Sequence, residues 1–258
     1  MKKLMTLAAL VAACAPAFTA EVTSSNTVGY QKIAIPQNSM DIIGVQFQKV
    51  GGGAQSAQDL IPEGYSAYGT DWIMVYDHAT SAYTKAYYWG AAADGGVYES
   101  ADAEEPLGPG WGDGNQNVLD IDLADGRGFW TQAVAGGTLL VAGEVATDAI
   151  TIPKNSMTIV TSTYPGALSI QDIVPTGYSD YGTDWIMVYD RTTSTYTKAY
   201  YWGAAADGGV YESADAEEPI GPGWGDGNQN VINITLSAGQ GFWTQCVTGG
   251  SLAFPSAD

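Results

Sequence analysis

DWIMVYDHATSAYTKAYYW, residues 71–89, is the stretch of this sequence that says most about the fold. Two runs rich in aromatic and β-branched residues flank a short polar turn, a pattern typical of a β-hairpin. In the simplest register the opposing pairs are Trp72 with Tyr87, Met74 with Lys85, and Tyr76 with Tyr83. Because side chains alternate between the two faces of a strand, one face carries Trp72, Tyr76, Tyr83, Tyr87 and Trp89, and the other carries Ile73, Val75, Thr84, Ala86 and Tyr88.

The hairpin belongs to a long internal repeat. Residues 64–118 recur as residues 177–231 without a gap, and only five of the 55 positions differ. The similarity extends outward on both sides, because IAIPQNSM (33–40) matches ITIPKNSM (150–157) and the later motif GRGFWTQ recurs as GQGFWTQ. A repeat of this length is the size of a small domain, so the sequence predicts two copies of one structural unit.

The rest of the sequence also favours strands. Short apolar runs alternate with turns, and the chain contains 33 Gly and 11 Pro. The prediction is an all-β protein in which each copy is a β-sandwich or a small β-barrel. The expected organisation is a signal peptide at 1–20, a first β-module at 21–145 and a second at 146–258, each able to fold alone.

The first 20 residues resemble a secretory signal peptide. Lys2 and Lys3 precede an apolar stretch, and small residues follow at Ala15, Ala17 and Ala20. The sequence therefore predicts a bacterial exported protein that is extracellular or on the cell surface, with the periplasm as another destination. VAAC also resembles a lipoprotein box, so a lipid anchor at Cys14 is an alternative. No later apolar run is long enough for a transmembrane helix.

Composition excludes several classes of function. The chain has 28 Asp and Glu against 9 Lys and Arg, a net charge of −19. So few basic residues cannot displace phosphate counterions, which argues against a nucleic-acid partner. One His and two Cys leave little for His-based catalysis, and His78 falls in the hairpin turn of one copy only. We therefore expect no enzyme. Cys246 is expected to be a small buried side chain, with an intermolecular bridge as the alternative.

A long acidic loop follows the hairpin in each copy. Residues 90–117 contain seven Gly and six carboxylates but no Lys or Arg, and residues 203–230 repeat them with one change. Oxygen-rich loops suit Ca²⁺, and DGNQN resembles part of a calcium loop. The alternative is a solvated acidic face, with no cofactor. The candidate metal ligands are Asp102, Glu104, Glu105, Asp113, Asn115 and Asn117, with Asp215, Glu217, Glu218, Asp226, Asn228 and Asn230 in the second copy.

Trp111 and Trp224 lie within GPGWGDG in these loops. Their Gly-rich surroundings favour a position outside the core, so both are candidate anchors for binding or for packing, and we predict them as ligand-binding residues. The aromatic face of the hairpin has two interpretations. It is either part of the core or an exposed platform on which sugar rings stack.

The order of motifs completes the sequence evidence. IPxNSM, QDIVP, DWIMVYD…YTKAYYW and LSAGQGFWTQ together resemble uncharacterised β-modules of secreted bacterial surface proteins, which end in a G-x-G-F-W hairpin. The resemblance implies an exported surface module and brings no activity or cofactor. We expect a non-enzymatic structural or binding protein, calcium-stabilised if the acidic loops hold metal. Its partner would be a surface polymer, a glycan or a second copy. The alternatives are a carbohydrate-binding protein that uses its Trp and Tyr surfaces, and an outer-membrane β-barrel.

Overall fold

The computed structural model describes residues 28–124, 126–145 and 149–255, so the expected signal peptide and Cys14 lie outside it. Regular structure in these residues is β-strand, apart from two single-turn 3-10 helices, η1 (Ala57–Asp59) and η2 (Ile170–Asp172). The prediction of an all-β protein is confirmed. Among the described residues, no helix combines the length and the apolar character needed to cross a membrane.

The N-terminal half, residues 28–145, contains two main antiparallel sheets. The five-stranded sheet has the order β10 (Gly110–Gly112), β7 (Ala82–Trp89), β6 (Tyr68–Asp77), β12 (Gly128–Ala133) and β2 (Ser39–Gly44). In the four-stranded sheet, β13 (Gly137–Val145) pairs with β1 (Val28–Ile35), β3 (Phe47–Gln48) and β5 (Ile61–Glu63). Two small ribbons complete this half: β4 (Gln55–Ser56) with β11 (Asp122–Leu123), and β8 (Val97–Tyr98) with β9 (Pro106–Gly108).

The C-terminal half, residues 149–255, repeats this strand order. Its five-stranded sheet consists of β15 (Ser156–Thr161), β24 (Gly241–Cys246), β18 (Tyr181–Asp190), β19 (Thr195–Trp202) and β22 (Gly223–Gly225). Its second sheet is smaller, with β14 (Ile150–Ile152), β25 (Gly250–Ala253) and β17 (Val174–Thr176). The two ribbons are β16 (Leu168–Ser169) with β23 (Thr235–Leu236), and β20 (Val210–Tyr211) with β21 (Pro219–Gly221).

The three residue pairs predicted for the hairpin are confirmed. Strands β6 and β7 pair Trp72 with Tyr87, Met74 with Lys85, and Tyr76 with Tyr83. Asp77 closes the turn by accepting hydrogen bonds from the backbone amide of Ala79 and from the hydroxyl of Thr80. The pairing shifts between Tyr68 and Trp72, so Trp89 falls outside the regular register.

Each half has its own hydrophobic core between its two main sheets. In the N-terminal half, Ile73, Val75 and Ala86 point from β6 and β7 toward Leu139 and Val141 of the other sheet. The C-terminal half repeats this core with the equivalent residues. The predicted Ile73 face is therefore the core face of the hairpin, and the aromatic face points away from that core.

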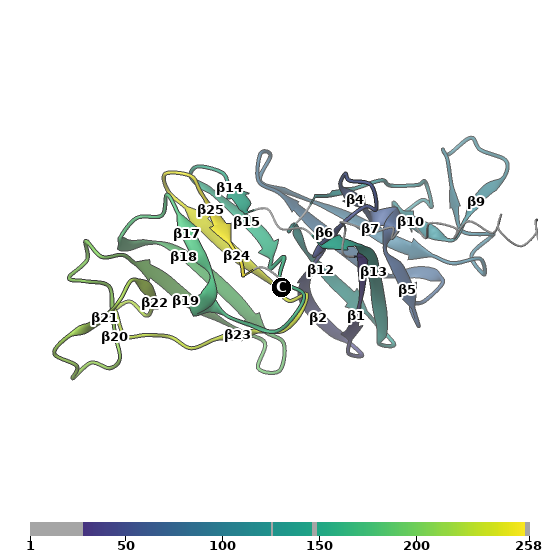
Figure 1. Ribbon diagram of the computed structural model, residues 1–258. Helices are drawn as coiled ribbons and strands as arrows, with labels where there is room; N and C mark the ends of the chain where they lie inside the picture. The colour runs from purple at the N-terminus through teal and green to yellow at the C-terminus, as the bar shows by residue number, and fades with distance from the viewer. Residues whose placement is uncertain (1–27, 125, 146–148, 256–258) are drawn as a thin grey trace, which may run out of the picture.

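Figure 1 shows two lobes side by side, one for each half. They meet where β2 and β12 of the N-terminal half contact β15 and β24 of the C-terminal half. The β8–β9 and β20–β21 ribbons, which belong to the two acidic loops, lie at opposite far ends of the molecule.

Candidate functional site

A third buried cluster joins the two halves, and we call it the aromatic seam. Its buried members are two aliphatic and four indole side chains: Ile42, Trp72, Trp130, Ile159, Trp185 and Trp243. Partly buried residues pack around them: Met74, Tyr76, Tyr87, Met187, Tyr189 and Tyr200. The four indoles, two from the hairpins and two from β12 and β24, are 6–7% exposed and are therefore excluded from solvent. The aromatic face is thus neither the core of one copy nor an exposed platform, but the contact between the copies.

The contacts across the seam occur in pairs, because each contact has a counterpart in which the equivalent residues of the two halves are interchanged. Tyr76 packs on Trp243 at 5.1 Å between ring centroids, and its counterpart Tyr189 packs on Trp130 at 5.2 Å. The backbone follows the same rule. The amide of Gly44 donates to the carbonyl of Gly239, and the amide of Thr161 donates to that of Gly126. The halves are therefore related by an approximate twofold axis through the seam.

Trp89 and Tyr83 leave the seam, although the alternation predicts them on the same face. Trp89 donates its indole N–H to the carbonyl of Asp113 at 3.0 Å and covers Gly69. Tyr83 is 45% exposed and lies at the rim, 5.1 Å from Tyr76. Trp89 therefore fixes the acidic loop rather than the contact between halves, and Trp202 does the same through Asp226.

The acidic loops are more ordered than their composition predicts. Each contains a short ribbon and an edge strand, β10 or β22, paired to the hairpin. The Gln58 side chain holds β10 in place by donating to the carbonyls of Trp111 and Leu119 and accepting from the amide of Trp111. Gln171 makes the same three bonds in the C-terminal half. These glutamines are not among the residues predicted for the site, although each begins a short motif shared by the two halves, QDLIP (58–62) and QDIVP (171–175).

Asp113 closes the last turn of its loop. Its carboxylate accepts hydrogen bonds from the backbone amides of Asn115 and Asn117, at 2.8 and 3.0 Å, and from the side-chain amide of Asn117. Partial burial disfavours the charged form, but these bonds outweigh it and lower the pKa of Asp113. The same bonds lower the pKa of Asp226 in the second loop. Both carboxylates are therefore charged and held by their own loops at neutral pH.

Of the other candidate metal ligands, Asn117 and Asn230 are hydrogen-bonded through their side chains to these carboxylates. Asp102, Glu104 and Glu105 are exposed, as are Asp215, Glu217 and Glu218. Asn115 and Asn228 are exposed, whereas Asn117 and Asn230 are half-buried through their bonds to Asp113 and Asp226. In the part of the chain that the structure describes, no three His, Cys, Asp or Glu side chains are grouped closely enough to hold a metal ion. Calcium binding stays a prediction.

Calcium is expected to raise the melting temperature if the loops are metal sites. At a concentration about ten times the dissociation constant, one site adds about 1.4 kcal/mol to the free energy of unfolding. That corresponds to several degrees for a domain of this size. The measurement is a melt in CaCl₂ against NaCl at matched ionic strength. Asp113→Ala with Asp226→Ala lowers the melting temperature in both salts by removing turn bonds, so only loss of the difference between salts supports the site. Equal melting temperatures in calcium and EDTA contradict it.

Trp111 and Trp224 are buried, so the prediction that they lie outside the core is wrong. Each is 1% exposed. The Trp111 indole donates to the carbonyl of Leu60 at 3.3 Å and packs edge-on against Tyr65 at 5.9 Å. The flanking glycines are required because β10 lies close under the loop, where a Cβ on Gly112 would come 2.8 Å from the carbonyl of Asn117. These rings anchor the loops from inside and present no surface to a ligand.

Two further carboxylates are buried, although the sequence did not predict a role for them. Asp71 and Asp184 are completely buried. Asp71 accepts from the amides of Ser66 and Val134, at 2.6 and 2.8 Å, and Asp184 accepts from those of Ser179 and Val247. Each ties the start of a hairpin strand to the turn that follows β12 or β24, which indicates a structural role.

Cys246 is a free, fully buried core residue, as predicted. Burial raises the pKa of its thiol, and its counterpart Ala133 fills the same place in the N-terminal half. Cys246→Ala should therefore cost only about 1 kcal/mol of unfolding free energy. In a protein that comprises residues 21–258, and therefore lacks Cys14, a thiol reagent should label Cys246 only when the protein unfolds. Rapid labelling of the native protein would contradict its buried position.

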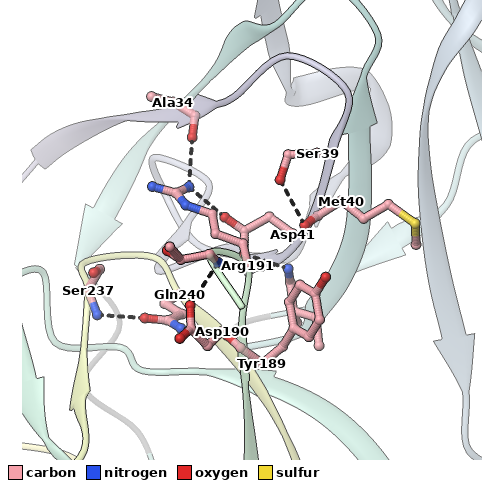
Figure 2. Close-up of polar contacts among 11 residues, drawn as sticks. Ala34, Ser39, Met40, Asp41, Tyr189, Asp190, Arg191, Ser237 and Gln240 are labelled. Atoms are coloured by element: carbon pink, nitrogen blue, oxygen red, sulfur yellow. Dashed lines mark hydrogen bonds and ion pairs between the residues drawn. The ribbon is translucent and has the colours of Figure 1, made fainter. Parts of the chain in front are cut away.

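A polar cleft opens where the lobes meet, beside the seam. Its volume is about 630 Å³, and its walls come from the edge of β1, the β18–β19 turn and residues 233–240. Figure 2 shows Arg191 reaching from that turn toward Asp41 and Ala34 of the other half. The Arg191 guanidinium lies 2.7 Å from the Asp41 carboxylate and 3.3 Å from the Ala34 carbonyl. Burial raises the pKa of Asp41, and Arg191 opposes this shift only in part.

Comparison of this chain with protein-family models, with curated proteins and with solved structures finds no match.

Proposed function

We propose that this chain is an exported, non-enzymatic structural or binding protein made of two duplicated β-sandwich modules, which are joined face to face and present two acidic loops. The observation that carries the proposal is the aromatic seam. In the seam, the aromatic face of each hairpin holds the two copies together. The nearly identical acidic loops lie away from this contact, at the far ends of the molecule (Figure 1).

The loops have the features of a presented surface. Five of the six carboxylates in each loop are exposed, whereas hydrogen bonds of Trp111, Trp89 and Gln58 hold the backbone beneath them. A rigid loop loses less conformational entropy when it binds a partner than a mobile one does. Rigid acidic loops in both copies thus favour recognition of a surface polymer or a cation over a role in solubility alone.

We propose no catalytic activity because of where the reactive side chains lie. His78 lies in a turn, and Arg191 takes its position in the other copy. Cys246 is enclosed in the core, and Asp71 and Asp184 are buried, with each carboxylate accepting hydrogen bonds from two backbone amides. None of these groups combines exposure with a partner that would activate it.

Export is tested by expressing the full chain in a bacterium and determining the amino terminus of the recovered protein by mass spectrometry. The proposal expects a mature protein outside the cytoplasm that begins near residue 21. A lipid-modified terminus at Cys14 would indicate the membrane-anchored form. An intact Met1 in the cytoplasm would contradict export.

Recognition by the loops is tested on a glycan array with and without calcium. In the test variant Asn or Gln replaces six of the exposed acids in the two loops: Asp102, Glu104, Glu105, Asp215, Glu217 and Glu218. A matched control neutralises exposed acids elsewhere, with Asp120→Asn and Asp122→Asn. Binding by the native chain and the control but not by the test variant supports the proposal. Equal binding by all three shows that the loops are not the recognition surface.

We propose carbohydrate binding in the cleft as a second candidate. The observation that favours it is a cavity of about 630 Å³. Its lining includes the polar residues Asn233, Thr197 and Ser237 and the charged residues Lys32 and Arg191. Hydroxyl and amide groups of this kind bind sugar hydroxyls. On the same array, Asn233→Ala with Thr197→Val should abolish binding that the loop variant retains. Binding that survives this change would exclude the cleft.

A further inference from the structure

The aromatic side chains of the seam are the same in both halves, so they cannot make one face select the other as its partner. Trp72, Trp130 and Tyr76 recur as Trp185, Trp243 and Tyr189, and Ile42 recurs as Ile159. Each face thus presents the same large side chains to any partner. Such faces would pair with a copy of themselves as well as with each other, unless smaller residues discriminate.

Gly44 and Thr161 occupy equivalent positions, and they face each other across the approximate twofold axis. A Cβ placed on Gly44 would lie 2.6 Å from both Cβ and Cγ2 of Thr161. That distance is far below van der Waals contact, so the site has room for one side chain only. The neighbouring close contacts show no such difference. Gly241 packs on Ile42, and its counterpart Gly128 packs on Ile159.

Asp41 and Arg191 form a second unlike pair. Their ion pair joins the halves at one side of the axis (Figure 2). The two side chains lie 2.7 Å apart, and Asp41 is 7% exposed. The equivalent positions on the other side carry Thr158 and His78. The second ion pair that an exact twofold would generate is therefore replaced by a neutral residue and a histidine.

We propose that the Gly44–Thr161 and Asp41–Arg191 pairs make the two aromatic faces bind each other and reject copies of themselves, so that the partner of each face is the unlike half of the same chain. Pairing of two C-terminal faces would bring Thr161 against Thr161 and Arg191 against Thr158. Pairing of two N-terminal faces would leave Gly44 opposite Gly44, without the methyl contact that Thr161 supplies.

The ion pair suits discrimination better than stabilisation. A partly buried carboxylate loses hydration that its partner does not fully restore, in keeping with the raised pKa of Asp41. In the wrong pairing Arg191, whose side chain is 44% exposed in the native contact, would lack the Asp41 carboxylate at 2.7 Å, and the loss of this ion pair disfavours that pairing. Size and charge thus act together against the pairing of two C-terminal faces.

The test exchanges the two side chains in the full chain and measures the molar mass by light scattering and the near-ultraviolet circular dichroism. Gly44→Thr puts Thr on both faces. We expect the seam to open, the aromatic signal to fall, and exposed faces to give oligomers whose mass rises with concentration. Gly44→Thr with Thr161→Gly restores one large and one small residue, and should restore the monomer and the signal.

The exchange separates this proposal from a purely local need for Gly44. A Cβ on Gly44 would also lie 2.8 Å from the carbonyl of Arg127 in its own half. The C-terminal half accommodates Thr at the equivalent place, since the Thr161 hydroxyl donates to the Gln240 carbonyl at 3.1 Å. Failure of the exchange to rescue Gly44→Thr would overturn the proposal. A monomeric Gly44→Thr with a native signal would also overturn it.

A charge exchange provides a second measurement if Gly44→Thr does not fold. Asp41→Arg alone should give oligomers or a weaker aromatic signal, and Asp41→Arg with Arg191→Asp should recover the native values. No recovery would remove the charge pair from the proposal. These results do not depend on export or on any ligand, so the proposed function can fail while this inference stands.

Discussion

Trp224→Ala should lower the free energy of unfolding by about 3–5 kcal/mol, the usual cost of deleting a large buried aromatic side chain. Trp224 is 1% exposed and packs edge-on against Tyr178 at 5.8 Å. The substitution leaves a cavity, and the Ile173 carbonyl loses the indole N–H at 3.2 Å. Denaturant unfolding followed by circular dichroism measures the loss.

The control for Trp224 is Ile220→Ala in the same acidic loop. Ile220 is 62% exposed, so its removal should change the free energy by less than about 0.5 kcal/mol. A loss below about 1 kcal/mol for Trp224→Ala would mean that the ring is not a core anchor. The original expectation of an exposed ligand-binding residue would then return.

Trp72→Ala should also cost about 3–5 kcal/mol, but through the contact between the halves. Trp72 is 7% exposed in the aromatic seam. Its indole donates to Gln132 at 2.8 Å, and the Lys85 ammonium lies 4.2 Å from the ring centroid. The separate cores of the two halves stay intact, so the aromatic circular dichroism should fall more than the β-sheet signal. Chemical denaturation monitored at both wavelengths measures this difference.

Two further variants test the Trp72 result. Trp185→Ala removes the equivalent ring of the C-terminal half and should cost a similar amount, because Lys198 and Gln245 surround it in the same way. Tyr68→Ala removes a 64% exposed aromatic from the same strand as Trp72 and should be nearly neutral. Equal effects of Trp72→Ala and Tyr68→Ala would show that the seam contributes little.

The hairpin could be predicted in detail because its sequence carries a strict alternation. Ile73, Val75 and Ala86 on one face and Trp72, Tyr76 and Tyr87 on the other leave one register that keeps each set together. The pairing is local in sequence, so no long-range information was required. The same reasoning failed at Trp89, where the irregular pairing near Tyr68 ends the alternation.

The aromatic seam could not be predicted, because alternation says that a face is apolar but not what covers it. Trp72 joins the cluster that contains Trp185 and Trp243 only after two domain-sized segments have folded. Trp111 was misplaced for a related reason. Seven glycines around it are typical of an exposed loop, yet here Gly110 and Gly112 allow the backbone to lie close over the core. Asp71 was overlooked since a carboxylate at a strand start normally faces water, whereas backbone amides surround this one.

The placement of the β8–β9 and β20–β21 ribbons at opposite ends limits how the protein can engage a partner. One small ligand cannot touch both loops of a molecule, so two loops give no chelate effect on a single compact ligand. Two binding events on one chain would be independent, with a stoichiometry of two and no cooperativity. A long polymer or two separate surfaces, by contrast, would be cross-linked at a fixed spacing. Because the seam sets that spacing, substitutions that open it should change cross-linking while leaving the affinity of each loop unchanged.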